Sequence, residues 1–388
     1  MTHAKAEAAG VRIRLHDIKI LSFFRRNIVM TIAMAAAALT SLIVPPDTAY
    51  ADYFDFKTLT CLFCVLAVVC ALKNIDFFYI IAQKIVECTK SARMSVLALV
   101  CITFVGSMLI ANDMALLTFL PLGYYVLHTG KAEKYMIITF ILQNIAANLG
   151  GMLTPFGNPQ NLYIYSKFNI PNLEFMGIML IPFAISLLLI GALCVIFVKA
   201  EPLLLERSEK KLPLGRCSLY LCLFALAIAI VFKEIPYLIG LAVIPAVLIF
   251  ADKKALKAVD YPLLLTFVFF FIFAGNMARI GVIRDLFSSL MQKSALLTSA
   301  VSCQFISNVP SAILLSQFTD NYRDLLVGVN IGGVGTLISS LASLITFREF
   351  TTRYPEQTKK YVKTFCVVNF SFLFFLLFAM LSLRALGI

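Results

Sequence analysis

Charged residues are scarce in this sequence, and histidine is nearly absent. Of the 388 residues only 14% are Asp, Glu, Lys or Arg, against about 25% in an ordinary soluble domain, while 61% are hydrophobic. A water-soluble fold could not hide that much apolar surface. Apolar runs long enough to cross a bilayer recur from Ile28 almost to the C-terminus. We therefore predict a single all-α, multi-pass membrane domain with no soluble catalytic module.

The scarcity of histidine also excludes several kinds of chemistry. The only histidines are His3, His16 and His128, and most of the ten cysteines lie inside apolar segments. A zinc site needs Cys or His at characteristic spacing, and an intramembrane hydrolase needs a Ser and His pair or two acidic residues. We expect neither enzymatic activity nor a resident cofactor.

The basic residues lie in the loops between apolar spans, although the net charge of +12 could suggest nucleic acid as a partner. This placement is typical of the positive-inside topology of membrane proteins, so we expect a lipid bilayer as the environment and no nucleic acid. Residues 1–27, which end in basic residues, are predicted to be a cytoplasmic tail, and the protein is predicted to lie in the plasma (inner) membrane with its N-terminus in the cytoplasm.

The charges of two loops predict that the chain contains two halves of opposite orientation. The loop 45–55 has three Asp and no basic residue, whereas 252–260 has three Lys, yet each precedes an apolar span. Equivalent loops on opposite sides indicate inverted-topology repeats. The predicted segments are a first repeat at 28–198, a cytoplasmic linker at 199–216, a connecting helix at 217–236 and a second repeat at 237–388.

Each half contains an apolar block with a polar centre. Residues 94–127 begin and end at basic loops, are about twice the length of one span, and carry Ala111, Asn112 and Asp113 at their centre. Such a block is either two full spans or a re-entrant hairpin, and we favour the hairpin. Residues 295–318, with Ser-Asn-Val-Pro-Ser at 307–311, form the second candidate hairpin.

A glycine-interrupted span follows each hairpin. The sequences NLGGMLT at 148–154 and NIGGVGT at 330–336 share the Asn, both glycines and the Thr. Unwound chain inside a membrane persists only where protein, water or a ligand satisfies its backbone, so four interruptions should surround one cavity. The half-helix N-termini there would attract anions, and free carbonyl groups would hold a cation.

The hairpin tips offer helix caps and one carboxylate. Asn112 or Asp113 can cap the following half-helix, as Ser307 or Asn308 can cap the one that begins near Pro310. Asp113 is the only acidic residue in either hairpin interior and is therefore a candidate site for Na+ or a proton; the alternative is a cap that faces a wet vestibule. No Lys or Arg lies in either hairpin core, so helix ends, amides and hydroxyls would have to hold an anionic substrate.

In total we predict about nine transmembrane helices plus two re-entrant hairpins. One observation does not fit the positive-inside rule, because the outer loops of the second half carry Arg279, Arg284, Lys293 and Arg323.

Four motifs resemble those of the citrate-transporter-like ion transporter superfamily, which includes arsenite efflux proteins, sodium/proton antiporters and citrate or dicarboxylate carriers. They are LIANDMALLTFLPL, LTPFGNPQNLYIY, ISNVPSAILL and GGVGTLISSLASLITF. The resemblance implies an elevator-type carrier, often a homodimer. Carried over by motif, it implies a binding region of Asn112, Asp113, Thr154, Gly157, Asn158, Pro159, Ser307, Asn308, Pro310, Gly333, Thr336 and Ser339. The shared residues of the broken spans, Asn148, Gly150, Gly151, Asn330 and Gly332, complete the predicted site.

The hairpin tips depart from the Ser-Asn-Thr pattern of the dicarboxylate branch and are closer to the arsenite-efflux branch and to uncharacterised anion permeases. The leading prediction is a carrier of a small anion, oxyanion or organic acid, such as a citrate-like or dicarboxylate-like solute, coupled to Na+ or H+. Arsenite or antimonite efflux and Na+/H+ antiport are the alternatives within transport. An ion channel is the alternative outside it.

Overall fold

The computed structural model describes residues 23–24, 27–203 and 212–386. In that part of the chain the regular structure is helical, with one isolated bridge between Ser91 and Pro202 and no strand, so the all-α prediction is confirmed. Most of the predicted tail and the middle of the linker lie outside the described residues. Six described segments are long and apolar enough to span a membrane: Phe56–Asn74, Glu133–Leu153, Asn172–Phe197, Leu214–Val231, Tyr261–Arg279 and Pro355–Ala385. Three shorter apolar helices are Ile28–Ile43, Ala92–Ser107 and Tyr237–Ala251.

Residues 1–55 and 260–284 contribute the smaller of two compact units. In its described part, helix α2 (Ile28–Ile43) packs along α13 (Tyr261–Arg279), and the short 3-10 helix η1 (Thr48–Tyr53) also contacts α13. The side-chain amide of Asn276 donates to the hydroxyl of Thr40 at 3.3 Å, so α2 and α13 run in the same direction.

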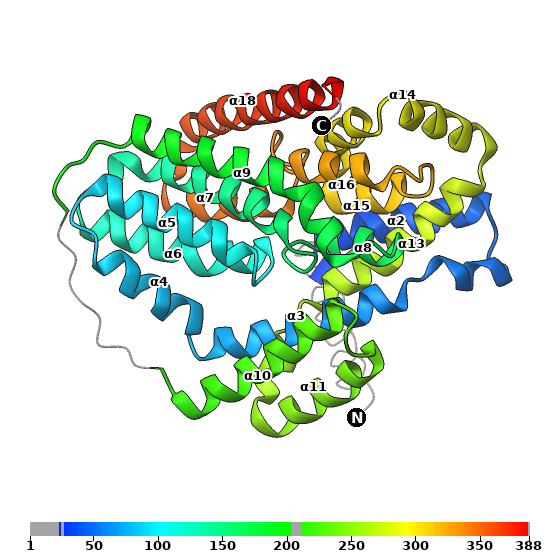
Figure 1. The fold of residues 1–388 in the computed structure, drawn as a ribbon, viewed down its shortest axis with the longest axis horizontal. Helices are drawn as coiled ribbons and strands as arrows, with labels where there is room; N and C mark the ends of the chain where they lie inside the picture. The colour runs from blue at the N-terminus through cyan, green and yellow to red at the C-terminus, as the bar shows by residue number, and fades with distance from the viewer. Residues whose placement is uncertain (1–22, 25–26, 204–211, 387–388) are drawn as a thin grey trace, which may run out of the picture. The chain divides into compact units, whose positions relative to one another are not determined.

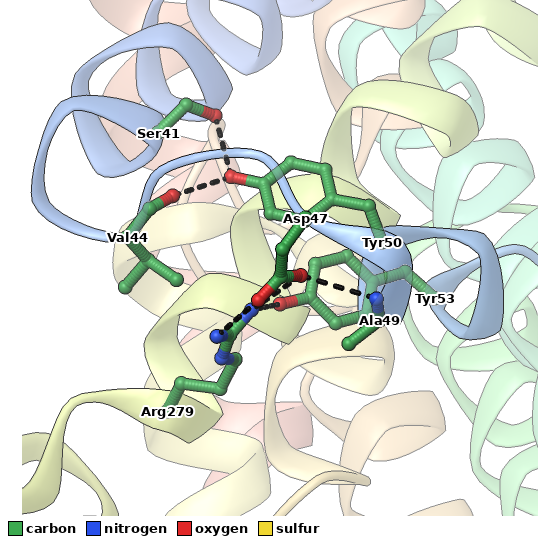
Figure 2. Close-up of polar contacts among 7 residues, drawn as sticks. All are labelled: Ser41, Val44, Asp47, Ala49, Tyr50, Tyr53 and Arg279. Atoms are coloured by element: carbon green, nitrogen blue, oxygen red, sulfur yellow. Dashed lines mark hydrogen bonds and ion pairs between the residues drawn. The ribbon is translucent and has the colours of Figure 1, made fainter.

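An ion pair joins the end of α13 to the loop after α2, as Figure 2 shows. The two guanidinium nitrogens of Arg279 donate to the two carboxylate oxygens of Asp47 at 3.0 and 2.7 Å, and one of them also donates to the hydroxyl of Tyr53 at 3.2 Å. The hydroxyl of Tyr50 donates to the carbonyl oxygen of Val44 at 2.6 Å. Arg279, which the positive-inside rule did not predict, is thus paired with an acid.

The larger unit, residues 56–259 and 285–388, holds the other elements. The bounds of its long helices are α3 (Phe56–Asn74), α4 (Phe77–Glu87), α5 (Ala92–Ser107), α6 (Asn112–Thr129), α7 (Met136–Gly150), α8 (Pro159–Lys167), α9 (Asn172–Phe197), α10 (Leu214–Val231), α11 (Tyr237–Ala251), α15 (Asn308–Leu315), α16 (Tyr322–Ile331), α17 (Leu341–Arg353) and α18 (Thr358–Ala385), with α14 (Gly281–Ile306) beginning at the boundary. Short pieces are α12 (Lys253–Ala258) and the 3-10 helices η2 (Glu133–Tyr135), η3 (Gly151–Leu153) and η4 (Pro355–Gln357).

The helices of the larger unit differ in how deeply they are buried. Helices α5, α6 and α7 pack against one another, and α3 packs against α10 and α11 (Figure 1). In the apolar stretch that contains α7, 94% of the residues are buried, whereas in the apolar stretch of α9 only 22% are buried. Since α9 is also strongly apolar, its exposed surface is suited to lipid.

The helices of the two halves can be placed in two series of similar order. Helices α3, α4, the pair α5 and α6, the pair α7 and α8, and finally α9 make the first series. The second series is α13, α14, α15, α16 with α17, and α18. Helix α14 is kinked at Ser294, where φ is −163° and ψ is 100°, so residues 281–293 correspond to α4 and residues 295–306 to α5. This matching order is what the repeat prediction requires, while the opposite orientation of the halves stays a prediction.

Candidate transport site

The two hairpin tips have the same local backbone. Ala111 has φ of 50° and Ser307 has φ of 72°, and a helix begins at the next residue in both cases, Asn112 or Asn308. The side-chain oxygen of Asn112 accepts from the backbone N–H of Asp113 at 3.0 Å, and that of Asn308 accepts from the N–H of the residue after it at 2.9 Å.

The capping prediction needs correction at these tips. Asn112 and Asn308 are the first helical residues rather than the caps, because the sharp turn with positive φ lies one residue earlier. Ser307 does occupy the cap position of α15, but its hydroxyl donates to the side-chain oxygen of Asn308 and to the carbonyl oxygen of Ser339, both at 3.3 Å, and makes no capping bond with a backbone N–H of the first turn. Pro310 is the third residue of α15, within the first turn as expected.

The helix interruptions are present where the sequence places them. Helix α7 ends at Gly150 and α8 begins at Pro159, while α16 ends at Ile331 and α17 begins at Leu341. The predicted residues Gly151, Thr154, Gly157 and Asn158 lie in the first interruption, and Gly332, Gly333, Thr336 and Ser339 lie in the second.

A threonine in each interruption fastens it to the preceding hairpin. The hydroxyl of Thr154 donates to the backbone carbonyl oxygen of Met108 at 2.8 Å, and the hydroxyl of Thr336 donates to the backbone carbonyl oxygen of Gln304 at 3.1 Å. Met108 and Gln304 both lie four residues before the Asn at their own hairpin tip. The two contacts are therefore made by equivalent positions.

A glycine at the point where each broken helix ends packs against the first hairpin helix. A Cβ atom at Gly150 would lie 2.1 Å from the carbonyl oxygen of Phe104, and one at Gly332 would lie 2.8 Å from the Cα of Ala300. Phe104 and Ala300 each lie eight residues before the tip Asn. Glycine is needed at both places because it lets two backbones approach closely.

These contacts have the same spacing from the tip Asn in both halves. They match the hairpins at Asn112 and Asn308 and the broken helices at Asn148 and Asn330. The spacing from tip to break differs between halves because α6 has 18 residues and its counterpart α15 has 8. The motifs NLGGMLT and NIGGVGT, which share four of seven residues, thus also make similar tertiary contacts.

A buried amide network connects the two halves, with Asn112, Asn148, Asn158, Asn161 and Asn330 as members. The amide nitrogen of Asn112 donates to the side-chain oxygen of Asn148 at 3.3 Å. That of Asn158 donates to the backbone oxygen of Asn148 at 3.1 Å and to the side-chain oxygen of Asn330 at 3.3 Å. Asn330 in turn donates to the side-chain oxygen of Asn161 at 2.6 Å.

Sequence reasoning missed several members of the amide network and its neighbours. Besides Asn161, these are Asn144, which donates to the hydroxyl of Ser343 at 3.3 Å, and Gln160, which donates to Asn330 at 3.4 Å. The signal that could have found Asn144 is its position one turn before Asn148 in a largely apolar helix.

Two buried oxygens in this region have no hydrogen-bond partner among the described residues. They are the side-chain oxygens of Asn158 and Gln160, and each residue is only 1% exposed. Buried acceptors of this kind are uncommon unless water or an ion fills the gap. A Cβ at Gly151 would lie 2.5 Å from the Asn158 oxygen, so only glycine leaves room there.

The remaining predicted residues lie around this network. Asp113 is half-buried in the first turn of α6, at the positive end of the helix dipole. Ser339 donates to the carbonyl oxygen of Gly333 at 2.9 Å, and its own carbonyl oxygen accepts from the N–H of Asn308 at 2.9 Å. Pro159 is the first residue of α8, where proline loses no helical bond.

The geometry combines two hairpins, two broken helices and a buried polar junction in a membrane chain. The citrate transporter model matches residues 18–321. The chain belongs to the citrate transporter family. An uncharacterized transporter from Methanocaldococcus jannaschii is 34% identical over 76% of this chain and 81% of its own length. The inner membrane protein YbiR of Escherichia coli is 27% identical over 76% of this chain and 80% of its own length.

A more distant relative, the P protein of Mus musculus, is 24% identical over 51% of this chain and 24% of its own length. Membership of the citrate transporter family makes the chain a multi-pass membrane transporter and not an enzyme. Neither of the first two relatives carries a substrate in its name.

Proposed function

We propose that this member of the citrate transporter family is a secondary active carrier of a small anion or organic acid, coupled to Na+ or H+. The observation that carries the proposal is the repeated set of contacts between hairpin tip and broken helix, joined at Asn158 and Asn330. A site shared by two repeats is what alternating access by one repeat against the other requires.

The lengths of the second hairpin's helices favour a re-entrant arrangement. Residues 295–306 would reach about 18 Å and the eight residues of α15 about 12 Å, at 1.5 Å per residue. The hydrocarbon core of a bilayer is about 30 Å thick, so neither helix could cross it. This supports a re-entrant hairpin in the second half, and our proposal includes two inverted repeats, each with such a hairpin, and an elevator mechanism.

The site offers one set of groups to a cation and another set to an anion. The buried oxygens of Asn158 and Gln160 and the carboxylate of Asp113 offer the hard oxygen ligands that a small cation prefers. The N-terminal turns of α6 and α15 offer backbone N–H groups to an anion. Because the amide network has no basic side chain, a co-bound cation would supply the positive charge that the anion needs.

Other transport functions use the same residues differently. Arsenite or antimonite efflux and Na+/H+ antiport would both retain Asp113 as an essential group, and an ion channel would use the broken helices as a pore. We also propose a homodimer in the plasma membrane with the N-terminus in the cytoplasm, following the basic loops.

The test is the thermal stability of the purified protein with citrate, succinate, sulfate or arsenite, with and without sodium, at two pH values. A bound ligand raises the unfolding temperature by mass action. We expect one anion to stabilise the protein only when sodium is present or the pH is low, and Asp113→Asn to abolish this effect. Asp52→Asn, at an exposed position in η1, is the matched control. A response to sodium or pH with no response to any anion would contradict the proposal and favour an antiporter.

A further inference from the structure

A cavity of about 380 Å³ lies at one end of α7, α9 and α18, and none of the predicted transport-site residues lines it. These three helices pack against one another in the larger unit (Figure 1). The cavity is lined by the side chains of Lys134, Lys199 and Lys360 and by a group of apolar residues that includes Ile137 and Phe197.

The cavity carries excess positive charge. Lys134 is paired with Glu201 at 2.6 Å. Lys199 and Lys360 are both exposed, and in the described part of the chain neither has a carboxylate within ion-pair distance. Three lysines thus face one carboxylate, which leaves two charges for an anion to neutralise.

The placement of Lys360 is unfavourable for the helix that bears it. Helix α18 begins at Thr358, so Lys359, Lys360 and Lys363 lie in or next to its first turn, where Glu356 of the preceding 3-10 helix η4 is the one acidic residue. Cations at a helix N-terminus oppose the helix dipole and the unpaired N–H groups there. An anion bound between these lysines would turn the unfavourable arrangement into a favourable one.

The apolar side of the cavity indicates what kind of anion fits. Phe197 is 49% exposed at the end of α9, whose apolar stretch is only 22% buried. A phospholipid fits both features. Its anionic headgroup would be held by the lysines, and its apolar tail would lie along the exposed aromatic and aliphatic side chains. Basic pockets between membrane helices are known to hold anionic headgroups.

We propose that this cavity binds the headgroup phosphate of an anionic phospholipid through Lys199 and Lys360, with an acyl chain lying along Phe197. The proposal depends on the membrane placement of α7, α9 and α18 and not on the identity of the transported solute. Inorganic phosphate shares the headgroup chemistry but lacks the tail, so the two ligands can be told apart.

The experiment measures binding to the delipidated, full-length protein in detergent by native mass spectrometry. Phosphatidylglycerol, phosphatidylcholine and inorganic phosphate are the probes. We expect phosphatidylglycerol to bind most tightly and its dissociation constant to rise roughly thirty-fold in the double variant Lys199→Gln, Lys360→Gln, since each lysine near an anionic lipid contributes about 1 kcal/mol. The matched control Lys254→Gln, Lys257→Gln removes the same charge from exposed positions of α12 and should bind like wild type.

If the double variant and its control bind phosphatidylglycerol with equal affinity, the proposal is overturned. It is also overturned if inorganic phosphate binds as tightly as phosphatidylglycerol and displaces it. A second measurement does not depend on folding of any variant. A photoactivatable phosphatidylglycerol should label peptides containing Phe197 or Thr364, which both line the cavity, in the wild-type protein. Labelling confined to other segments would also overturn the proposal.

Discussion

Replacing Gly150 by alanine should destabilise the protein strongly, because the added methyl group has no room. The new Cβ would lie 2.1 Å from the carbonyl oxygen of Phe104 and 2.6 Å from the hydroxyl oxygen of Ser107, where ordinary contacts are 3.4–4 Å. The nearest atom belongs to the backbone of α5, so relief requires moving one helix against another. Overpacking typically costs roughly 1–3 kcal/mol, and a backbone clash should place Gly150→Ala near 3 kcal/mol.

The repeat register predicts the same effect, at smaller size, in the other half. A Cβ at Gly332 would lie 2.8 Å from the Cα and 2.9 Å from the carbonyl oxygen of Ala300, so Gly332→Ala should cost about 2 kcal/mol. The matched control is Gly191→Ala in α9, where nothing lies within 4 Å. There alanine should be neutral or stabilise the helix by up to about 1 kcal/mol.

The assay suits the composition of the chain. The sequence has no tryptophan, but free cysteines such as Cys64, Cys194 and Cys303 are buried, so a thiol-reactive dye can report thermal unfolding. We expect the unfolding temperature to rise in the order Gly150→Ala, Gly332→Ala, wild type, with Gly191→Ala at or above wild type. If Gly150→Ala unfolds at the same temperature as Gly191→Ala, the close approach of α5 and α7 is wrong.

Two further predictions concern other contacts. The ion pair with Arg279 holds the pKa of Asp47 below its ordinary value of 3.8, so the stabilisation it gives is present at neutral pH and lost as pH falls through this lowered pKa. In circular dichroism melts, the unfolding temperature of Arg279→Gln should therefore lie below that of wild type at pH 7, and this gap should shrink below about pH 4. A gap in unfolding temperature that does not depend on pH would count against the ion pair. Asn158→Ala should remove the donor to the backbone oxygen of Asn148 and leave the side-chain oxygen of Asn330 with Gln160 as its remaining donor, at a cost of about 1–3 kcal/mol. An unchanged unfolding temperature would exclude the junction at Asn158.

The sequence was sufficient to place many helices and interruptions. The apolar runs of the sequence at 28–44, 56–72 and 173–198 agree closely with α2 (Ile28–Ile43), α3 (Phe56–Asn74) and α9 (Asn172–Phe197). This success has a simple cause, since prolines and polar or charged residues bound each long apolar run. The interruptions after Gly150 and Ile331 were also predictable, because glycine pairs inside an apolar run favour unwinding.

The partners of the buried amides could not be predicted in the same way. Asn144 and Gln160 bond to Ser343 and Asn330, which lie 199 and 170 residues away along the chain, so the local sequence does not reveal these partners. The kink at Ser294 has no proline or glycine to mark it. Such features depend on which helices meet, and that is a property of tertiary packing and not of local sequence.

The most direct test of a carrier site shared by two repeats is counterflow of radiolabelled citrate or succinate in proteoliposomes. We predict saturable entry that is accelerated by unlabelled substrate inside, and loss of this entry in both Asn112→Ala and Asn308→Ala, since each begins one of the two equivalent half-helices. Substrate flux that does not saturate and shows no counterflow, or that depends on only one of the two asparagines, would contradict the account.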